Sequence, residues 1–328
     1  MTLDALSARW RAAFRAAEES LRCAGYARFD PHELNDRGRR LARERSEVAG
    51  LLEAVAREEH THLSRSLTAP PATIRMLGLP PQLHACVFDL DGVLTASAAL
   101  HAAAWKEGVD EFLVRWHDRA GERFGPLSLF DPATEYYAYI HGKPRLDGVQ
   151  AFLASRGISV PVGEPSDSPG AETAYGLAAR KNDVLRRLLE GRGVEAYEGS
   201  QQYLEAAREA RVDCAVVSAS ANTGAILGLS GLAGLIEQQV DGNTIRHEHL
   251  HSKPEPDTTL AACRKLGVPP SEVAAFETTA AGIRAARAAG VGLVIAVDRT
   301  GRPETLSGAG ADRVVGDLAE LLDPALAA

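Results

Sequence analysis

Two carboxylates, Asp89 and Asp91, follow directly on an apolar run and precede a glycine, in the order Cys86-Val-Phe-Asp89-Leu-Asp91-Gly92. In an extended segment, side chains at positions i and i+2 point to the same side, so both carboxylates converge where the strand ends. Open α/β sheets bind their ligands at the carboxyl ends of their strands. Paired carboxylates suit a divalent cation, and one of them can also serve as a nucleophile. The alternative is a buried strand that runs into an ordinary Asp-Gly turn.

Polar residues with related chemistry follow three later apolar runs. Ser218, Ser220 and Asn222 lie where a strand turns into a helix, and a serine with the backbone N–H groups at a helix start can hold a phosphate. Lys253 precedes a proline-stiffened helix start and supplies a compact cation. Glu277 ends a further strand. The structural alternatives are an N-cap role for Ser220, a solvated surface lysine, and a capping Glu or Thr.

Apolar runs that predict strands alternate with alanine-rich stretches that predict helices. The predicted strands span 84–90, 213–218, 272–277, 292–297 and 312–315, and the predicted helices span 201–211, 222–234, 257–266, 280–289 and 316–322. This alternation indicates an α/β fold with a Rossmann-like, doubly wound parallel sheet. The interval 96–198 is mostly helical and too long for one crossover, so we expect it to fold as an inserted helical cap. The core is then formed by 81–95 and 199–328.

The first 80 residues differ from the rest in charge and pattern. Residues 1–80 hold 13 arginines, no lysine and 11 acidic residues and so carry +2, whereas the remainder carries −10. Residues 3–24 and 31–63 predict two amphipathic helices that form an N-terminal α-helical hairpin, followed by a proline-rich linker. Apolar residues recur every seven positions along the second helix, at Leu34, Leu41, Val48 and Val55. The hairpin is expected to pack on the main domain or on a second copy, which would give a homodimer.

Composition narrows the class of protein. A net charge of −8, and acids interleaved with the arginines of the hairpin, argue against a nucleic-acid partner. No run of 18 apolar residues occurs, so we expect no membrane span. The four cysteines are far apart and lack metal-ligand spacing, which is typical of reduced thiols in a cytoplasmic protein.

Taken together, the four polar clusters resemble, in order and spacing, the motifs of the haloacid dehalogenase superfamily of phosphotransferases over roughly residues 83–320. Within that superfamily the chain is most similar to the β-phosphoglucomutase-like group with a helical cap. This closer resemblance rests on four sets of residues: Leu100, His101 and Trp105; the run Gly142-Lys-Pro-Arg145-Leu-Asp-Gly148; the run Arg180-Lys181-Asn182-Asp183; and the run Ser218-Ala-Ser220-Ala-Asn222.

The resemblance implies a role for each matched residue. Asp89 would be the nucleophile that forms an aspartyl-phosphate, and Asp91 would protonate the leaving oxygen and later activate water. Ser218 and Lys253 would bind the transferring phosphoryl group. Mg²⁺ would be held by Asp89, Asp91 and Glu277. The expected substrate-binding residues are His101, Arg145, Lys181, Ser220 and Asn222.

Two positions depart from the family pattern. Thr278 stands where the fourth motif normally supplies a second acid to Mg²⁺, so a neutral hydroxyl replaces an anionic ligand and metal binding is expected to weaken. Ala221 stands where mutases of the group have a lysine for a second, distal phosphate. That loss favours hydrolysis over isomerisation.

The sequence therefore predicts a Mg²⁺-dependent phosphatase acting on a small phosphorylated metabolite, such as a sugar phosphate, through an aspartyl-phosphate. A β-phosphoglucomutase-type isomerase is the enzymatic alternative, because Arg145 and Lys181 remain to bind a distal phosphate. A domain that has lost catalysis and binds a phosphorylated ligand or a partner is the alternative from another class.

Overall fold

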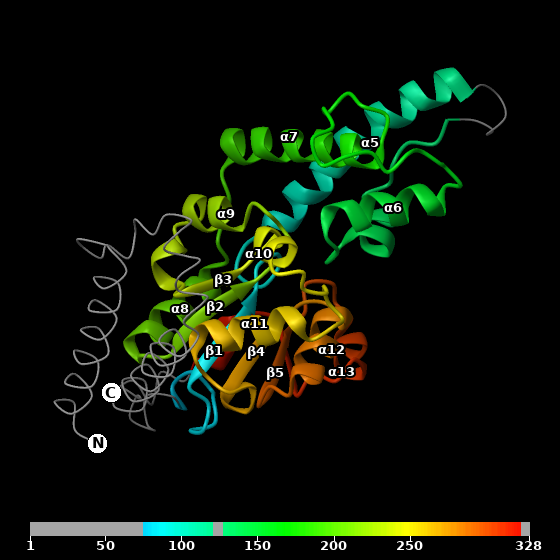
Figure 1. The fold of residues 1–328 in the computed structure, drawn as a ribbon. Coiled ribbons are helices and arrows are strands. Elements are labelled where there is room, and N and C mark those ends of the chain that lie inside the picture. The colour runs from blue at the N-terminus through cyan, green and yellow to red at the C-terminus, as the bar shows by residue number, and fades with distance from the viewer. Residues whose placement is uncertain (1–74, 121–126, 323–328) are drawn as a thin grey trace, which may run out of the picture. The chain divides into compact units, whose positions relative to one another are not determined.

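The computed structural model describes residues 75–120 and 127–322 (Figure 1). Six parallel strands form one sheet in the order β3-β2-β1-β4-β5-β6. The strands are β1 (Ala85–Asp89), β2 (Asp213–Val217), β3 (Gln238–Val240), β4 (Val273–Glu277), β5 (Leu293–Val297) and β6 (Arg313–Val315). Strand β1 lies between β2 and β4, so the strand order changes direction at its carboxyl end. Ligand crevices of open α/β sheets lie at such a point.

Alternate side chains of β1 enter two separate hydrophobic cores, one on each face of the sheet. Cys86 and Phe88 belong to the first core, and Ala85 and Val87 belong to the second. This alternation follows from the two-residue period of a strand, and it requires helices on both faces. Burial on both faces also explains why these strands are almost continuously apolar.

Helices cover both faces, as the doubly wound prediction requires. The first face is covered by α8 (Glu198–Glu209), α9 (Thr223–Leu229) and the 3₁₀ helix η5 (Leu318–Leu321). The second is covered by α10 (Gly242–His247), α11 (Asp257–Leu266), α12 (Ala280–Ala289) and α13 (Pro303–Gly308), of which α11 lies in front of the strands in Figure 1. Two further 3₁₀ helices are η3 (Ala233–Leu235) and η4 (Pro270–Glu272).

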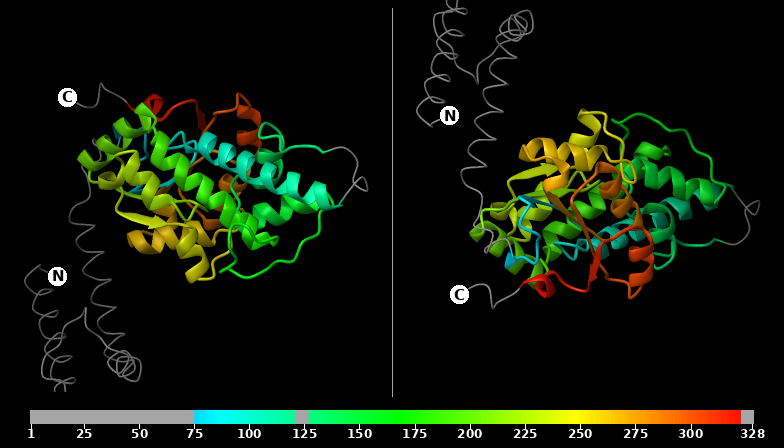
Figure 2. Two further views of the ribbon diagram at one scale, coloured as in Figure 1. Left: turned by 90° about the horizontal axis from the view of Figure 1, so that it is seen from above. Right: turned by 90° about the horizontal axis from the view of Figure 1, so that it is seen from below.

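A helical insertion, residues 96–198, separates β1 from the rest of the sheet in sequence. It contains α5 (Ser97–Ala120), the short π-helix η2 (Tyr136–Ile140), α6 (Arg145–Ser155) and α7 (Ala174–Arg192). Helices α5 and α7 lie side by side (Figure 2). The insertion has a hydrophobic core of its own, which includes Trp105, Phe112, Phe130, Phe152 and Leu177.

The structure differs from the predicted elements at several places. Strand β3 and helices α10 and α13 were not predicted, because each is six residues or shorter and shows no clear period. The helix predicted over 222–234 is interrupted, since Gly231 adopts a φ of +76° after α9 ends. The predicted helix 316–322 is a 3₁₀ helix.

The predicted N-terminal hairpin, and the homodimer that it would form, lie outside the described residues. No helix in the described ranges is both long and apolar enough to cross a membrane.

Candidate active site

Lys253 joins the two carboxylates that end the neighbouring strands β1 and β4. Its Nζ lies 3.0 Å from Asp89 Oδ1 and 2.7 Å from Glu277 Oε1. All three side chains are largely shielded from solvent, with exposed fractions of 9% for Lys253, 14% for Asp89 and 4% for Glu277. Charge-assisted contacts of this kind are strengthened by low local dielectric. The three residues thus form one charged cluster with a net charge of −1 when all are ionised.

The cluster shifts the protonation of its members. Burial disfavours the ammonium of Lys253, but the adjacent Asp89 and Glu277 outweigh that effect and hold its pKa above the usual value. Burial raises the pKa of Glu277 to about 7, although Lys253 opposes that shift. Lys253 is therefore a fixed cation beside Asp89, as a group that neutralises a phosphoryl acceptor needs to be.

The Thr278 hydroxyl contacts both Asp89 and the backbone of Asp91. Its Oγ1 lies 3.2 Å from Asp89 Oδ2 and 3.4 Å from the Asp91 carbonyl oxygen. Both contacts are hydrogen bonds donated by the hydroxyl. A hydroxyl, a carboxylate and a carbonyl oxygen are hard oxygen donors of the kind that would hold Mg²⁺. Within the described ranges, however, no three His, Cys, Asp or Glu side chains gather as a metal site. The residues fit Mg²⁺ with a neutral hydroxyl in place of a second anionic ligand.

Glycine at 92 lets the Asp91 turn pass close to Thr278. Gly92 has a φ of +90°, where an L side chain is strained, and a Cβ there would lie 3.2 Å from Thr278 Cγ2. The guanidinium of Arg299 fixes the same turn, because its Nε donates to the Gly92 carbonyl at 2.9 Å and the group stacks 3.7 Å from the Tyr197 ring centroid.

Asp91 is held from the start of the helical insertion. The buried Ser97 hydroxyl donates to Asp91 Oδ1, and Thr95 Oγ1 lies 2.6 Å from Ser97 Oγ. His101 Nε2 lies 3.9 Å from the same carboxylate oxygen, beyond hydrogen-bond distance, and is a buried atom without a hydrogen-bond partner. Asp91 is therefore oriented through one oxygen.

His101 and Lys181 form a buried pair between α5 and α7. The Lys181 Nζ lies 3.1 Å from His101 Nδ1 and 5.3 Å from the Trp105 ring centroid. Burial, and next the charge of Arg145, lowers the pKa of Lys181 to about 7. Burial and Lys181 in turn hold the pKa of His101 well below its usual value. An ammonium with so little anionic compensation is suited to receive an anionic ligand.

The loop after β2 contributes Ser218 and Ser220. Ser218 is 2% exposed, and its Oγ accepts from the Ser220 backbone N–H at 3.1 Å. Ser220 Oγ accepts from the Asn222 N–H at 3.2 Å within the loop. The N-cap role considered for Ser220 is wrong, because the N-cap of α9 is Asn222 and no side chain caps that helix. The Asn222 Nδ2 donates to Asn182 Oδ1 of α7 at 3.1 Å, which links this loop to the insertion.

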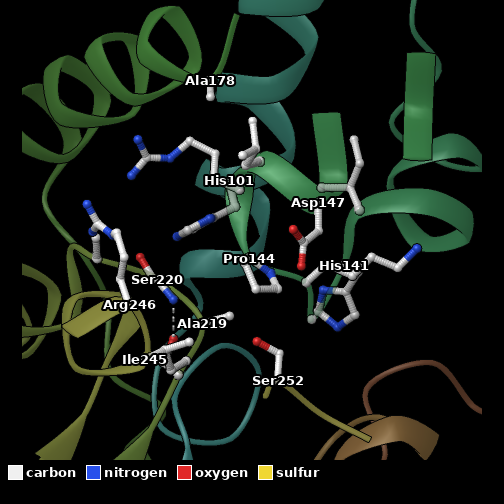
Figure 3. Close-up of a pocket in the computed structure, with 18 of the residues that line it drawn as sticks. His101, His141, Pro144, Asp147, Ala178, Ala219, Ser220, Ile245, Arg246 and Ser252 are labelled. Atoms are coloured by element: carbon white, nitrogen blue, oxygen red, sulfur yellow. Dashed lines mark hydrogen bonds between the residues drawn. The ribbon is translucent and has the colours of Figure 1, made fainter. Parts of the chain in front are cut away.

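A pocket of about 590 Å³ gathers the predicted site (Figure 3). The predicted residues that line it, from the β-sheet and from the insertion, are Asp89, Asp91, His101, Arg145, Lys181, Ser218, Ser220, Asn222 and Lys253. Glu277 lies behind this wall, in contact with Lys253. Residues that sequence reasoning missed are Ser97, His141 and Arg246; the signal for Ser97 was a hydroxyl pair, Thr95 and Ser97, at a helix start.

Known proteins of one family resemble this chain in sequence and in fold. A profile of the family described as haloacid dehalogenase-like hydrolase matches residues 83–290. The β-phosphoglucomutase of Mycobacterium bovis is 48% identical over 256 residues, which are 77% of this chain and 97% of that protein. The structure of CbbY from Rhodobacter sphaeroides in complex with phosphate has a TM-score of 0.57 at 24% identity, covering 74% of this chain and 98% of its own. That of β-phosphoglucomutase from Clostridium difficile has a TM-score of 0.58 at 22% identity, covering 73% and 93%.

Proposed function

This chain belongs to the haloacid dehalogenase-like hydrolases, and on that premise we propose that it transfers a phosphoryl group of a small sugar phosphate through Asp89. The observation that carries this proposal is the placement of Lys253 within 3.0 Å of both Asp89 and Glu277, facing a pocket with Ser218 at its wall. A lysine held against the acceptor carboxylate offsets the repulsion between that carboxylate and an incoming phosphate.

In the proposed first step the Asp89 carboxylate attacks phosphorus, and the bond from phosphorus to the sugar oxygen breaks. Asp91 gives its proton to that leaving oxygen, and Ser97 keeps the Asp91 carboxyl turned toward the pocket by bonding to Oδ1. In the second step an acceptor hydroxyl attacks the aspartyl-phosphate, Asp91 takes its proton, and Asp89 is restored. Ser218 and Lys253 hold the phosphoryl oxygens throughout.

Asp89, the Asp91 carbonyl and the Thr278 hydroxyl are the groups that would hold Mg²⁺, with the Glu277 carboxylate close by. When bound, the ion would neutralise charge on the phosphoryl oxygens as the bond to the leaving group breaks. We also propose that residues 96–198 act as a cap that excludes water, because α5, α6 and α7 supply one side of the pocket.

The acceptor that the site supports best is a second hydroxyl of the sugar, which makes the reaction a β-phosphoglucomutase-type isomerisation. Arg145, Lys181 and Arg246 line the pocket without a carboxylate within 4 Å in the described ranges. A monophosphate held by Ser218 and Lys253 leaves those cations uncompensated, whereas a bisphosphate places its second phosphate there. The 48% identity to a protein named β-phosphoglucomutase adds support.

Hydrolysis remains the second candidate, favoured by Ala221 in place of the lysine that mutases of the group use. One experiment separates the two. Purified full-length chain with Mg²⁺ is given β-glucose 1-phosphate and a catalytic amount of glucose 1,6-bisphosphate, and ³¹P NMR follows glucose 6-phosphate and inorganic phosphate together. Isomerisation predicts glucose 6-phosphate without an equal release of phosphate. If inorganic phosphate forms and glucose 6-phosphate does not, the reaction is hydrolysis and the proposed isomerisation is wrong.

The same assay tests the third alternative, a binding module without catalysis. Asp89→Asn removes the nucleophile but keeps the size of the side chain, so an enzyme loses at least about 10³-fold in turnover. If the natural chain turns over no phosphate ester of a broad panel, and Asp89→Asn binds sugar phosphates as tightly as the natural chain does, then the chain is a binding module.

A further inference from the structure

Helix α10 is packed unusually closely against the loop that contains Ala221. A Cβ at Gly242, the first residue of α10, would lie 2.6 Å from the Ala219 carbonyl oxygen and 2.8 Å from the Ala221 nitrogen. Both contacts are with backbone and cannot be relieved by moving a side chain. Glycine at 242 therefore permits α10 to start against the 219–221 loop.

Asn243 connects that loop to Arg246. The Asn243 Nδ2 donates to the Ala221 carbonyl oxygen at 3.0 Å, and its Oδ1 accepts from an Arg246 guanidinium nitrogen at 3.0 Å. One amide thus spans from the backbone at 221 to the head group of Arg246. The Asn243 side chain therefore connects the Arg246 guanidinium to position 221, where related mutases have the lysine that binds the distal phosphate.

Arg246 and Arg145 line the pocket from different parts of the molecule. Arg246 belongs to α10 of the core, and Arg145 belongs to α6 of the insertion. Figure 3 shows Arg246 beside Ser220 in the wall of the pocket. Burial, and next the charge of Arg246, lowers the pKa of Arg145 to about 10, while the charge of Asp183 opposes that shift. In the described ranges neither guanidinium has a carboxylate within 4 Å, so two like charges line the pocket without an ion-pair partner.

We propose that Arg246 replaces the lysine missing at position 221 and, with Arg145, binds the second phosphate of a bisphosphorylated sugar. The inference rests on the proposed function and deepens it by assigning a specificity-determining residue. Guanidinium groups suit this task, because each presents a planar fork of N–H donors to phosphate oxygens. Since the two arginines come from the core and the insertion, the second phosphate also ties the insertion to the core.

The test measures binding rather than turnover. Asp89→Asn is used as the background so that no transfer occurs, and titration calorimetry measures the affinity for glucose 1,6-bisphosphate and for inorganic phosphate. Adding Arg246→Gln is expected to weaken bisphosphate binding by about tenfold or more, since a charge-assisted contact is lost. Inorganic phosphate binding at Ser218 and Lys253 is expected to stay the same.

Restoration gives the sharper readout. Ala221→Lys added to Arg246→Gln is expected to recover most of the lost bisphosphate affinity. Arg264→Gln, an exposed arginine of α11 that does not line the pocket, is the matched control and is expected to change nothing. If Arg246→Gln binds the bisphosphate as tightly as the background variant does, the assignment of Arg246 is wrong, and the proposed function is unaffected. If the background variant binds neither glucose 1,6-bisphosphate nor inorganic phosphate, the proposed function fails instead.

Discussion

At the scale of single residues, Thr278 is expected to set how strongly the proposed site holds a metal ion. Its hydroxyl lies within 3.4 Å of Asp89 Oδ2 and of the Asp91 carbonyl oxygen. Thr278→Asp is expected to tighten Mg²⁺ binding about tenfold or more, because it replaces a neutral hydroxyl beside Asp89 with an anionic oxygen ligand. Titration calorimetry with MgCl₂ measures this directly, without substrate.

Thr278→Val is the matched control, since it keeps the shape of threonine and removes the hydroxyl. It is expected to bind Mg²⁺ more weakly than the natural chain. Equal affinity in all three proteins would mean that residue 278 lies outside the metal's ligand set.

Sequence reasoning at this scale succeeded where a residue ends a strand. The family resemblance put Asp89 and Glu277 in one predicted site, and the structure brings them together because β1 and β4 are adjacent parallel strands, whose carboxyl ends share one edge. Arg246 could not be found in the same way. The strand before it, β3, has three residues of which Val240 alone is buried, so the pattern contains too little period to place α10.

At the scale of elements, the start of α12 is shaped around Glu277. A Cβ at Gly282 would overlap the Glu277 carboxylate, although the backbone there is ordinary helix. Gly282→Ala is therefore expected to destabilise the fold by about 1–3 kcal/mol, as overpacking a buried site does, and to displace Glu277 from Lys253. Urea unfolding measures the free-energy change.

Gly191→Ala in α7 is the matched control. It lies in a helix with open space around its Cβ position, so alanine there is expected to leave stability unchanged or raise it by up to about 1 kcal/mol. If Gly282→Ala unfolds at the same urea concentration as the natural chain, the close fit between Glu277 and α12 does not contribute to the free energy of unfolding.

The long, regular elements were the predictable ones. Strands β1, β2, β4 and β5 are each five residues long and mostly apolar, and the sequence placed them to within a residue. Predictability failed where packing overrides pattern. The π-helix η2 is an example, since Tyr136 and Ile140 are buried by contact with the insertion's own core rather than by helical period.

At the scale of the whole molecule, buried charge at the pocket opposes stability and prepares for the ligand. Lys181 is 3% exposed, and burial lowers its pKa to about 7, whereas an unfolded lysine titrates near 10.5. Between these two values the unfolded chain binds more protons at this group than the folded chain, so its contribution makes stability rise with pH over that window. Below about pH 7 both states are charged, and the cost of burying the ammonium is fully present.

Lys181→Met removes that cost and keeps a long, flexible side chain. The variant is expected to be more stable than the natural chain at pH 6–7, on the order of 1 kcal/mol or more, and this advantage is expected to shrink as the pH rises toward 10. Thermal unfolding of both proteins across pH 6 to 9.5 measures the difference, in which the titration of other groups largely cancels. An advantage for the variant that does not change with pH would mean that Lys181 titrates near its ordinary value when folded. The more stable Lys181→Met variant is expected to bind glucose 1,6-bisphosphate more weakly, because it lacks the ammonium that would contact the anion. The group that destabilises the empty pocket is thus the group that binds the ligand.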